Sequence, residues 1–501
     1  MQGRKAYQEK LFTDFRLSDY VPADNLYRKI EELIDFQFIY RITATYYGRE
    51  GRKSIDPVVF MKLMLVGYLE NINSDRRIIE VSRLRMDILL FIGYDLGEEL
   101  PWHSTLSRTR QLYGQEVFGE VFRAVLAQCI DRGMVSGRRQ AVDGFFVKAN
   151  ASLDGMVARE ILEDAERFAR ELEENAGEFS PRSVKMPKQK GRKHPGLAPK
   201  KNPGNQTHCN PKDPDAKMSV KPGKATALNY LGEVSVDTDS HVITHIQAFT
   251  AEKRDCQCLP EIIPQLVSNL GENGLAVGEL LADKGFSSGE ALKALEEHGI
   301  TGYIPNRGRF VFERPGFAYD GSADHYICPN GIRLEFKGVK PCSGYHNRHY
   351  STGCKNCLGC PFTDGCPAYR GKKTFLKITV DSPYYERMHR RMQGRKAARM
   401  MKLRQSTVEP VIGTLVNFLG LRKLNTVGLA QAGKCMAMAG AAYNLKKLAR
   451  HTRNWTLKAA ALSKAIKKRA PELYRNLFCL FFDAGTSPRC PLPVLVQVEK
   501  P

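Results

Sequence analysis

The sequence has no apolar run long enough to cross a membrane. Its longest, PVVFMKLMLVGYL at 57–69, contains Lys62 and falls short of the roughly 20 residues that a membrane-spanning helix needs. The first residues, MQGRKAYQEKLFTDF, carry charges but are not followed by the apolar segment of a secretory signal. We therefore expect a cytoplasmic protein with no membrane partner, in which residues 57–69 form a buried helix.

Acidic residues are few beside the basic ones. The 501 residues include 76 Lys and Arg against 54 Asp and Glu, which gives a formal net charge of +22. Such a surplus is typical of proteins that bind a polyanion, nucleic acid before membrane, and the alternative is a basic soluble enzyme. Residues 180–206, rich in Pro, Gly and Lys, have no carboxylate at all and predict a disordered linker or a phosphate-contacting loop.

Helix signals dominate the first 135 residues. Asp56-Pro57 is an N-cap followed by proline at the first helical position, and Ser74 and a site near Ser104 begin two further long helices. In the last of these, Arg108 and Arg110 are expected to project from the first turns. The spacing fits a helical DNA-binding domain and a plain bundle with a solvated basic face equally well.

Strand signals begin at RRQAVDGFFVKA. We expect an amphipathic helix over 157–172, a hairpin over 228–250, and then a strand, turn, helix and strand that end near residue 305. A helical pattern resumes near 384 and continues to about 450. Strands alternating with helices after a hairpin predict an α/β fold with a sheet of mixed direction.

Three carboxylates stand out by their context. Asp143 lies inside an apolar strand, Asp283 ends a strand, and Glu409 follows Ser406 and Thr407, which we expect to cap a helix. Taken singly, each is more often a turn or cap residue. Phosphodiester chemistry gives a reason for the set, because two Mg²⁺ ions about 4 Å apart need only a few oxygen ligands on rigid elements.

The sequence resembles the DDE transposases of bacterial insertion sequences, of the IS1182 type within the IS4/IS5-like set. The resemblance covers about 40–450 and depends jointly on IDPVVFMKLMLVGYL, PWHSTLSRTRQ, AVDGFFVKANAS, DPDAKMSVKPGK, LADKGFSSGEALKALEEHGITGYIPNRG and RQSTVEPVIGTL. It implies an RNase H-like catalytic core with an all-helical N-terminal domain. It also implies that Asp143, Asp283 and Glu409 are the catalytic triad, holding two Mg²⁺ or Mn²⁺ ions per active site.

The same resemblance implies partners and a location. They are the terminal inverted repeats and the target DNA, bound by a homodimer or larger assembly in the bacterial nucleoid. Arg404 matches the family's arginine, but the basic residue usual two turns after the Glu is replaced by Val416. We expect Arg404, Lys148 and Lys284 to contact DNA, with solvated strand-end lysines as the alternative for the last two.

The basic run at 387–404 has eight Lys or Arg and no carboxylate. It leads directly to Glu409, so a contact with the DNA backbone is favoured over a merely solvated face.

Disulfides are not expected, because the 13 cysteines are odd in number and the compartment is reducing. Cys354, Cys357, Cys360 and Cys366 have the spacing C-x2-C-x2-C-x5-C, which suits a structural tetrahedral Zn²⁺. Cys328 or Cys342 could replace one ligand, and an iron–sulfur cluster or unliganded buried cysteines are the alternatives.

These patterns divide the chain into five parts. We expect a helical DNA-binding domain at 1–135, a first part of the catalytic core at 136–320 with a basic loop at 180–224, a cysteine-rich zinc-binding insertion at 321–375, the helical part of the core with Glu409 at 376–450, and a basic tail at 451–501. The predicted activity is cleavage and strand transfer of DNA. A catalytically inactive DNA-binding regulator or relic, and a nuclease without strand transfer, are the alternatives.

Overall fold

A computed structural model describes residues 15–48, 50, 54–160, 204–220, 225–307, 316–342, 345–370 and 373–451. Most of the amphipathic helix expected at 157–172, much of the basic loop at 180–224 and nearly all of the tail at 451–501 lie outside these residues. Val157, expected to be helical, instead lies in a short strand, β2 (Val157–Ala158), which pairs with β3 (His208–Cys209). In the described part of the chain, no helix is both long and apolar enough to cross a membrane.

The N-terminal part is helical, as expected. Asp56 accepts hydrogen bonds from the backbone N–H groups of Val58 and Val59 and so caps α4, which is buried along most of its length. Ser74 caps α5 in the same way. The helices are α1 (Leu17–Tyr20), α2 (Leu26–Leu33), α3 (Phe38–Thr43), α4 (Pro57–Leu69), α5 (Asp75–Leu84), α6 (Met86–Ile92), α7 (His103–Leu112) and α8 (Gln115–Asp131).

Two of these helices are shorter than the sequence pattern predicts. The helix that follows Ser74 is interrupted at Arg85, whose extended backbone lets the guanidinium pair with both Glu70 and Asp87. The helix near Ser104 is interrupted at Tyr113, whose ring is fully buried against Phe60. In both places a tertiary contact overrides a local helical pattern.

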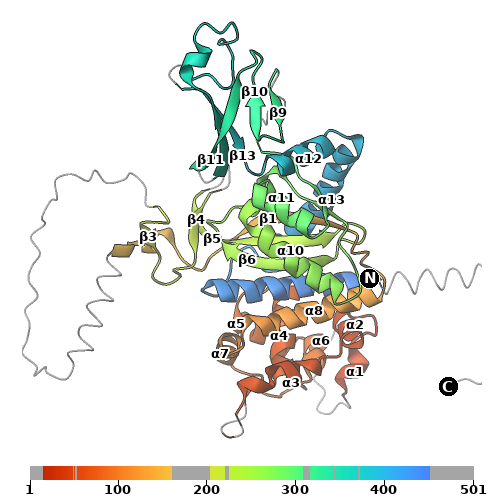
Figure 1. Ribbon diagram of the computed structural model, residues 1–501. Helices are drawn as coiled ribbons and strands as arrows, with labels where there is room; N and C mark the ends of the chain where they lie inside the picture. Colours follow the sequence, from red (N-terminus) through yellow and green to blue (C-terminus); the bar gives the residue numbers. More distant parts are fainter. Residues whose placement is uncertain are drawn as a thin grey trace, which may run out of the picture. The chain divides into compact units, whose positions relative to one another are not determined.

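A mixed sheet forms the centre of the molecule (Figure 1). The hairpin strands β5 (Ala227–Asp237) and β6 (Ile243–Thr250) are antiparallel, and β5 is also antiparallel to β1 (Arg139–Lys148). On its other edge β1 is parallel to β7 (Glu279–Leu281), which is parallel to β8 (Thr301–Tyr303). A short strand, β4 (Lys217–Ser219), extends the edge beside β5. The α/β class expected from the sequence is confirmed.

Helices surround this sheet. α10 (Asp255–Gly271) and α11 (Gly289–Glu297) follow the hairpin and β7 respectively, and the side chain of Ser288 caps α11. α12 (Ser382–Met392) and α13 (Arg395–Phe418) come later in the chain, and α13 contacts β1 and β5. A further helix over 429–446 packs against β6, where Asn444 bonds both backbone groups of Ile243.

A second sheet, which we call the five-stranded module, lies between β8 and α12 in the chain (Figure 1). Its strands are β9 (Ala318–Asp320), β10 (His325–Ile327), β11 (Arg333–Cys342), β12 (Tyr345–Ser351) and β13 (Phe375–Thr379), in the spatial order β13-β12-β11-β10-β9. A turn of 3-10 helix, η4 (Cys354–Cys357), follows β12. The small core of the module contains Leu334, Tyr350 and Leu376.

Candidate active site

Asp143 and Asp283 come together through the strand register. In the parallel pair of β1 and β7, Ala141 lies opposite Leu281, so the chain two residues further on presents one aspartate from each strand. Asp143 lies on β1 itself, and Asp283 lies just beyond the end of β7, where its Oδ1 accepts a hydrogen bond from the N–H of Gly285 at 2.7 Å. The parallel pairing of β1 and β7 thus brings together two acids that are separated by 140 residues.

The pKa of Asp143 reports this neighbourhood. Burial raises it above the usual range, the guanidinium of Arg404 opposes the shift, and the charge of Asp283 adds to it. The side chain of Asp143 retains 21% exposure, so it remains accessible from solvent.

Arg404 links the third acid to the first. Its Nη1 donates to Oδ2 of Asp143 at 2.9 Å, and its Nη2 lies 3.8 Å from Oε1 of Glu409. The side chain of Arg404 is 13% exposed and that of Glu409 is 50% exposed, so the guanidinium is enclosed while Glu409 faces solvent. Arg404, which we expected to bind DNA, therefore neutralises two of the three candidate catalytic carboxylates.

Glu409 is not in the first turn of a helix, as we had expected, but in the middle of α13. The hydroxyls of Ser406 and Thr407 do not cap a helix and instead donate back to the carbonyl of Leu403. The helix is held across the sheet at its start, where Lys396 of α13 pairs with Glu279 of β7 at 2.6 Å, as does Arg139 of β1. The Lys396 pair ties the start of α13 to β7, and the buried Ala397 and Met400 pack the helix against Leu281 and Tyr303.

The acids offer the donor set that Mg²⁺ prefers. All three supply carboxylate oxygens, and at least two are accessible to solvent, so that a bound ion could keep its waters. Among the described residues no three His, Cys, Asp or Glu side chains stand at the separations of a formed metal site. The guanidinium of Arg404 contacts both Asp143 and Glu409.

Two further acids lie against this site and were missed in the sequence. Glu233 of β5 is fully buried, and a Cβ built on Gly144, which pairs with it, would lie 3.0 Å from oxygens of both Glu233 and Asp255. Burial, followed by Asp255, Asp143 and Asp283, raises the pKa of Glu233 well above its usual range, which favours the protonated carboxyl. The signal was available, since Glu233 interrupts an apolar strand as Asp143 does.

The two lysines beside the aspartates are exposed. Lys284 follows Asp283 in the turn, while Lys148 ends β1 and lines a cavity of about 690 Å³ together with Lys212 and Lys423. The backbone of Lys148 also bonds Arg422 and Leu424, so the segment after α13 returns to the end of β1.

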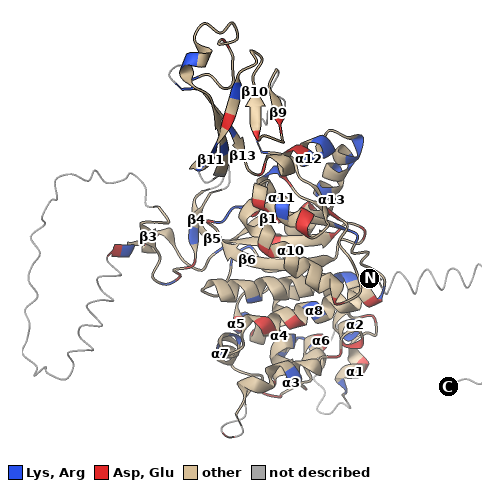
Figure 2. Cartoon of the chain, viewed as in Figure 1, with Lys and Arg blue, Asp and Glu red and all other residues tan. Residues whose placement is uncertain are grey.

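The basic run at 387–404 is divided between two roles. Some of its side chains bind the protein itself: Arg387 pairs with Glu296, Arg391 donates to the carbonyl of Gly302, and Lys396 pairs with Glu279. Arg395, Arg399 and Lys402 are exposed instead. Their spacing along α13 continues to Glu409, so they share its helical face. We call these three residues the α13 basic strip, and Figure 2 marks the Lys and Arg positions of α12 and α13 in blue.

In the N-terminal part the two expected DNA contacts differ. Arg108 is exposed on α7, but Arg110 is buried and forms a bidentate ion pair with Asp75 of α5, at 2.5 and 3.0 Å. Arg110 therefore does not project into solvent as we had expected, and in this conformation no phosphate can reach its guanidinium. Near Arg108, Trp102 is 76% exposed and lines a surface cavity with Arg76 and Arg83.

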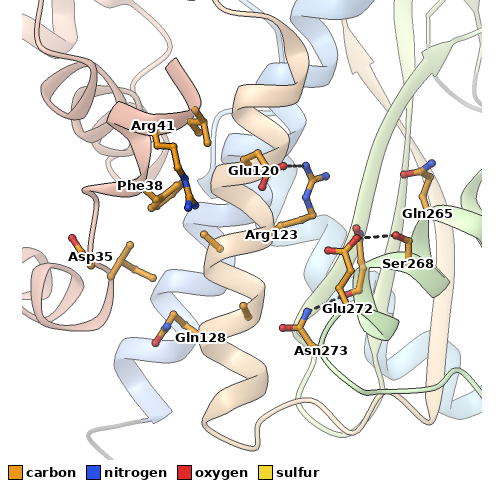
Figure 3. A pocket seen from close by; sticks show the side chains of 15 residues that line it. Asp35, Phe38, Arg41, Glu120, Arg123, Gln128, Gln265, Ser268, Glu272 and Asn273 are labelled. Atoms are coloured by element: carbon orange, nitrogen blue, oxygen red, sulfur yellow. Dashed lines mark hydrogen bonds and ion pairs between the residues drawn. The ribbon is translucent and has the colours of Figure 1, made fainter. Parts of the chain in front are cut away.

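A larger cavity, of about 730 Å³, lies elsewhere (Figure 3). It is lined from α3, α8 and α10, and its charged side chains include Arg41, Glu120, Arg123 and Glu272. Arg123 pairs with Glu120, and Ser268 bonds Glu272. None of the candidate catalytic acids lines it, so size alone does not identify the reactive site.

In the five-stranded module the four predicted zinc ligands do not all converge. Cys357, Cys360 and Cys366 line one small cavity, but Cys354 is exposed at the start of η4 and does not line it. Cys328, from the turn after β10, lines the cavity instead. Cys342, the other possible substitute, ends β11 in a pair with Tyr345.

Two family models match the chain. One, described as a transposase domain (DUF772), matches residues 15–112, and the other, described as a transposase DDE domain, matches residues 327–449. The first covers most of the helical N-terminal part, including Arg108, and the second contains Glu409, whereas Asp143 and Asp283 lie between the two matches. No curated protein and no solved structure matches the chain.

Proposed function

This chain is a DDE transposase of an insertion sequence, and on that premise we propose that it cuts DNA at the ends of its element and joins the freed 3′-OH to target DNA. The two matches are consistent with the IS1182-type group. One observation carries the proposal: Arg404 contacts both Asp143 and Glu409, and Asp283 follows β7, the parallel neighbour of the strand that carries Asp143. The strand order β6-β5-β1-β7-β8, with only the first two pairings antiparallel, supports an RNase H-like core.

The three acids are proposed to hold the divalent ions of the reaction. When bound, Mg²⁺ or Mn²⁺ would activate the attacking oxygen and stabilise the leaving one. Asp143 lies within β1 and Asp283 directly follows β7, so a paired strand holds the backbone of each, whereas Glu409 would supply its carboxylate from α13. Arg404 holds Asp143 and Glu409 in reach of each other.

The DNA is proposed to approach along α13. The α13 basic strip spans about 20 Å of helix up to Glu409, at a rise of about 1.5 Å per residue, and would bind successive phosphates. Lys148, Lys212 and Lys423 offer a second group of cations at the end of β1, about 17 Å along the strand from Asp143. Val416 stands where related transposases have a basic residue two turns after the Glu. Lys423, in the segment after α13, would supply a basic group instead.

The helical N-terminal part is proposed to bind the terminal inverted repeats. Arg108, Arg76, Arg83 and the exposed ring of Trp102 lie on α5 and α7 or at their ends, and such a mixture of cations and an aromatic ring suits a nucleic acid surface. Since an element has two ends, a homodimer or larger assembly on DNA is the expected active form.

The test is DNA cleavage by single variants of the acids. Asp143→Asn, Asp283→Asn and Glu409→Gln should each abolish Mg²⁺-dependent cleavage of element ends, while DNA affinity stays within a fewfold of the unmodified protein. Asp239→Asn, in the exposed turn of the β5–β6 hairpin, is the matched control and should cleave normally. Cleavage retained by any one variant removes that residue from the site.

Strand joining separates the alternatives. Incubation of cleaved element ends with target DNA should yield joined products. Cleavage without joining would identify a nuclease with the same core, and specific DNA binding without any cleavage would identify a regulator or an inactive relic.

A further inference from the structure

The five-stranded module contains a cavity that four cysteines share. Cys328, Cys357, Cys360 and Cys366 all line it, and the remaining lining is largely apolar, including Phe317, Ile332, Leu334 and Ala368. The cysteines come from two separate segments, the turn between β10 and β11 and the loop between β12 and β13. The cavity is therefore the place where these two segments meet.

The size and lining of the cavity restrict what could fill it. Its volume is about 20 Å³, which is close to the space of one water-sized sphere. A water there would need two to four polar partners, and thiols are weak ones. Four sulfur atoms around a space of this size suit a single soft cation instead, and tetrahedral Zn²⁺ binds four cysteine thiolates in this way.

Tight turns bring the sulfurs to the cavity. The N–H of Cys360 bonds the carbonyl of Cys357, and that of Cys366 bonds the carbonyl of Thr363. Gly359 and Gly365, which directly precede Cys360 and Cys366, have φ angles of +73° and +82°, a conformation that a side chain disfavours. In the other segment, the N–H of Gly331 bonds the carbonyl of Cys328. The thiols of Cys328, Cys360 and Cys366 are therefore positioned by turns and not by a helix or a strand.

The five-stranded module also needs a stabilising cross-link such as a bound metal ion. Its buried core consists of Leu334, Tyr350, Ala368, Leu376 and Ile378, against which Cys328 and Cys366 pack. A core this small supplies little stability, and small domains of this sort are commonly completed by a structural metal.

We propose that Cys328, Cys357, Cys360 and Cys366 bind one structural Zn²⁺, and that Cys354 is not a ligand. Each thiol gives its proton to solvent as its sulfur bonds the ion, and no electron is transferred. Because the described residues contain no three ligands at the separations of a formed metal site, binding draws the sulfurs inward over the cavity. With four thiolates the site is closed to substrate, so the ion fixes the β10–β11 turn to the loop after η4 and takes no part in DNA chemistry.

Metal analysis of the purified full-length protein tests this proposal without any measurement of DNA cleavage. We expect one zinc per chain, and replacement by Co²⁺ should give the absorption bands of a tetrahedral cobalt thiolate. A chain without stoichiometric zinc, or one that contains iron with acid-labile sulfide, overturns the proposal. This measurement does not depend on the folding of any variant.

Serine variants then test the ligand set. Cys328→Ser and Cys360→Ser should lose the zinc, whereas Cys354→Ser, a matched control only three residues before Cys357, should retain one zinc per chain. If Cys354→Ser loses the metal and Cys328→Ser keeps it, the ligand set proposed here is wrong. Should the loss variants fail to fold, retention of zinc by Cys354→Ser still decides whether that residue is needed.

Discussion

At the scale of single residues, the site is organised by a positive charge as much as by its acids. Arg404 bonds Asp143 directly and approaches Glu409, so in the absence of metal it offsets their mutual repulsion. Its side chain is largely enclosed, which makes a primary role in gripping DNA implausible by access alone. Arg404 is better described as a positioning residue for two of the acids.

The variant Arg404→Gln should distinguish the role of Arg404 in positioning Asp143 and Glu409 from the effect of its charge on metal binding. Arg404→Gln removes a cation that competes with the metal, so Mn²⁺ should bind the free protein more tightly, by about tenfold for the loss of one charge-assisted hydrogen bond. Cleavage should nevertheless slow, because Asp143 and Glu409 lose their common partner. Calorimetric titration with Mn²⁺ measures the change in metal affinity. Arg404→Lys should restore part of the original Mn²⁺ affinity and part of the cleavage rate. Unchanged Mn²⁺ affinity in Arg404→Gln would contradict the role.

Glu233 predicts a pH dependence of stability. Its pKa is raised in the folded protein, so above the usual glutamate pKa the folded chain holds a proton that the unfolded chain has released. Stability is then fully present at low pH and falls as pH rises towards the folded pKa, by up to about 1.4 kcal/mol per pH unit. Glu233→Gln should flatten this dependence and stabilise the fold at pH 8 more than at pH 4.

Urea unfolding at several pH values measures this difference. Glu290→Gln, an exposed carboxyl in the first turn of α11, is the matched control and should follow the unmodified protein. Parallel stability profiles for Glu233→Gln and the unmodified protein would show that Glu233 carries no such proton.

At the scale of elements, the pair between Asp75 and Arg110 joins α5 to α7. Both side chains are nearly enclosed, and loss of one partner of such a pair leaves an uncompensated buried charge, at a cost of about 3–5 kcal/mol. Arg110→Gln should therefore lower the free energy of unfolding by that amount. Arg108→Gln, on the exposed side of the same helix, should weaken DNA binding and leave stability nearly unchanged. A stable Arg110→Gln with reduced DNA affinity would return Arg110 to the DNA interface.

The sequence predicted those elements whose local signals agree with their tertiary setting. The cap at Asp56, the hairpin at 228–250, the strand that carries Asp143 and the strand that precedes Asp283 were all recognisable, because period, caps and turns are local properties. Glu409 was assigned to the wrong part of its helix because proline is common in first turns, whereas Pro410 follows a long stretch of α13.

What the sequence could not provide was the angle between elements. The buried contacts of Ala397 and Met400 with Leu281 and Tyr303 place α13 on the sheet, and Arg404 of that helix then pairs with Asp143. The choice between Cys328 and Cys354 as a zinc ligand also depends on how the elements are placed. Cys328 lies in the turn between β10 and β11, which the spacing of the other cysteines does not predict. Glu233 differs, because its position inside an apolar strand carried the same signal that identified Asp143.

At the scale of the whole molecule, the basic residues that produce the net charge of +22 are not equally available to DNA. Several basic side chains of 387–404 bind carboxylates or carbonyls of the protein, which leaves the α13 basic strip as an ordered row that leads to Glu409. If DNA follows this row, these three residues should contribute a measurable part of the salt dependence of affinity, because each phosphate contact releases condensed counterions.

The combined variant Arg395→Gln, Arg399→Gln and Lys402→Gln tests that path. The slope of log affinity against log salt should become shallower by up to about 2.7, since each neutralised phosphate contributes about 0.9. The loss should be similar for element ends and unrelated DNA, because phosphate contacts carry no sequence information. Arg123→Gln, which removes a basic residue that pairs with Glu120 on α8, should leave the slope unchanged. A triple variant with the original slope would place the DNA away from α13, even if the three acids proved essential for cleavage.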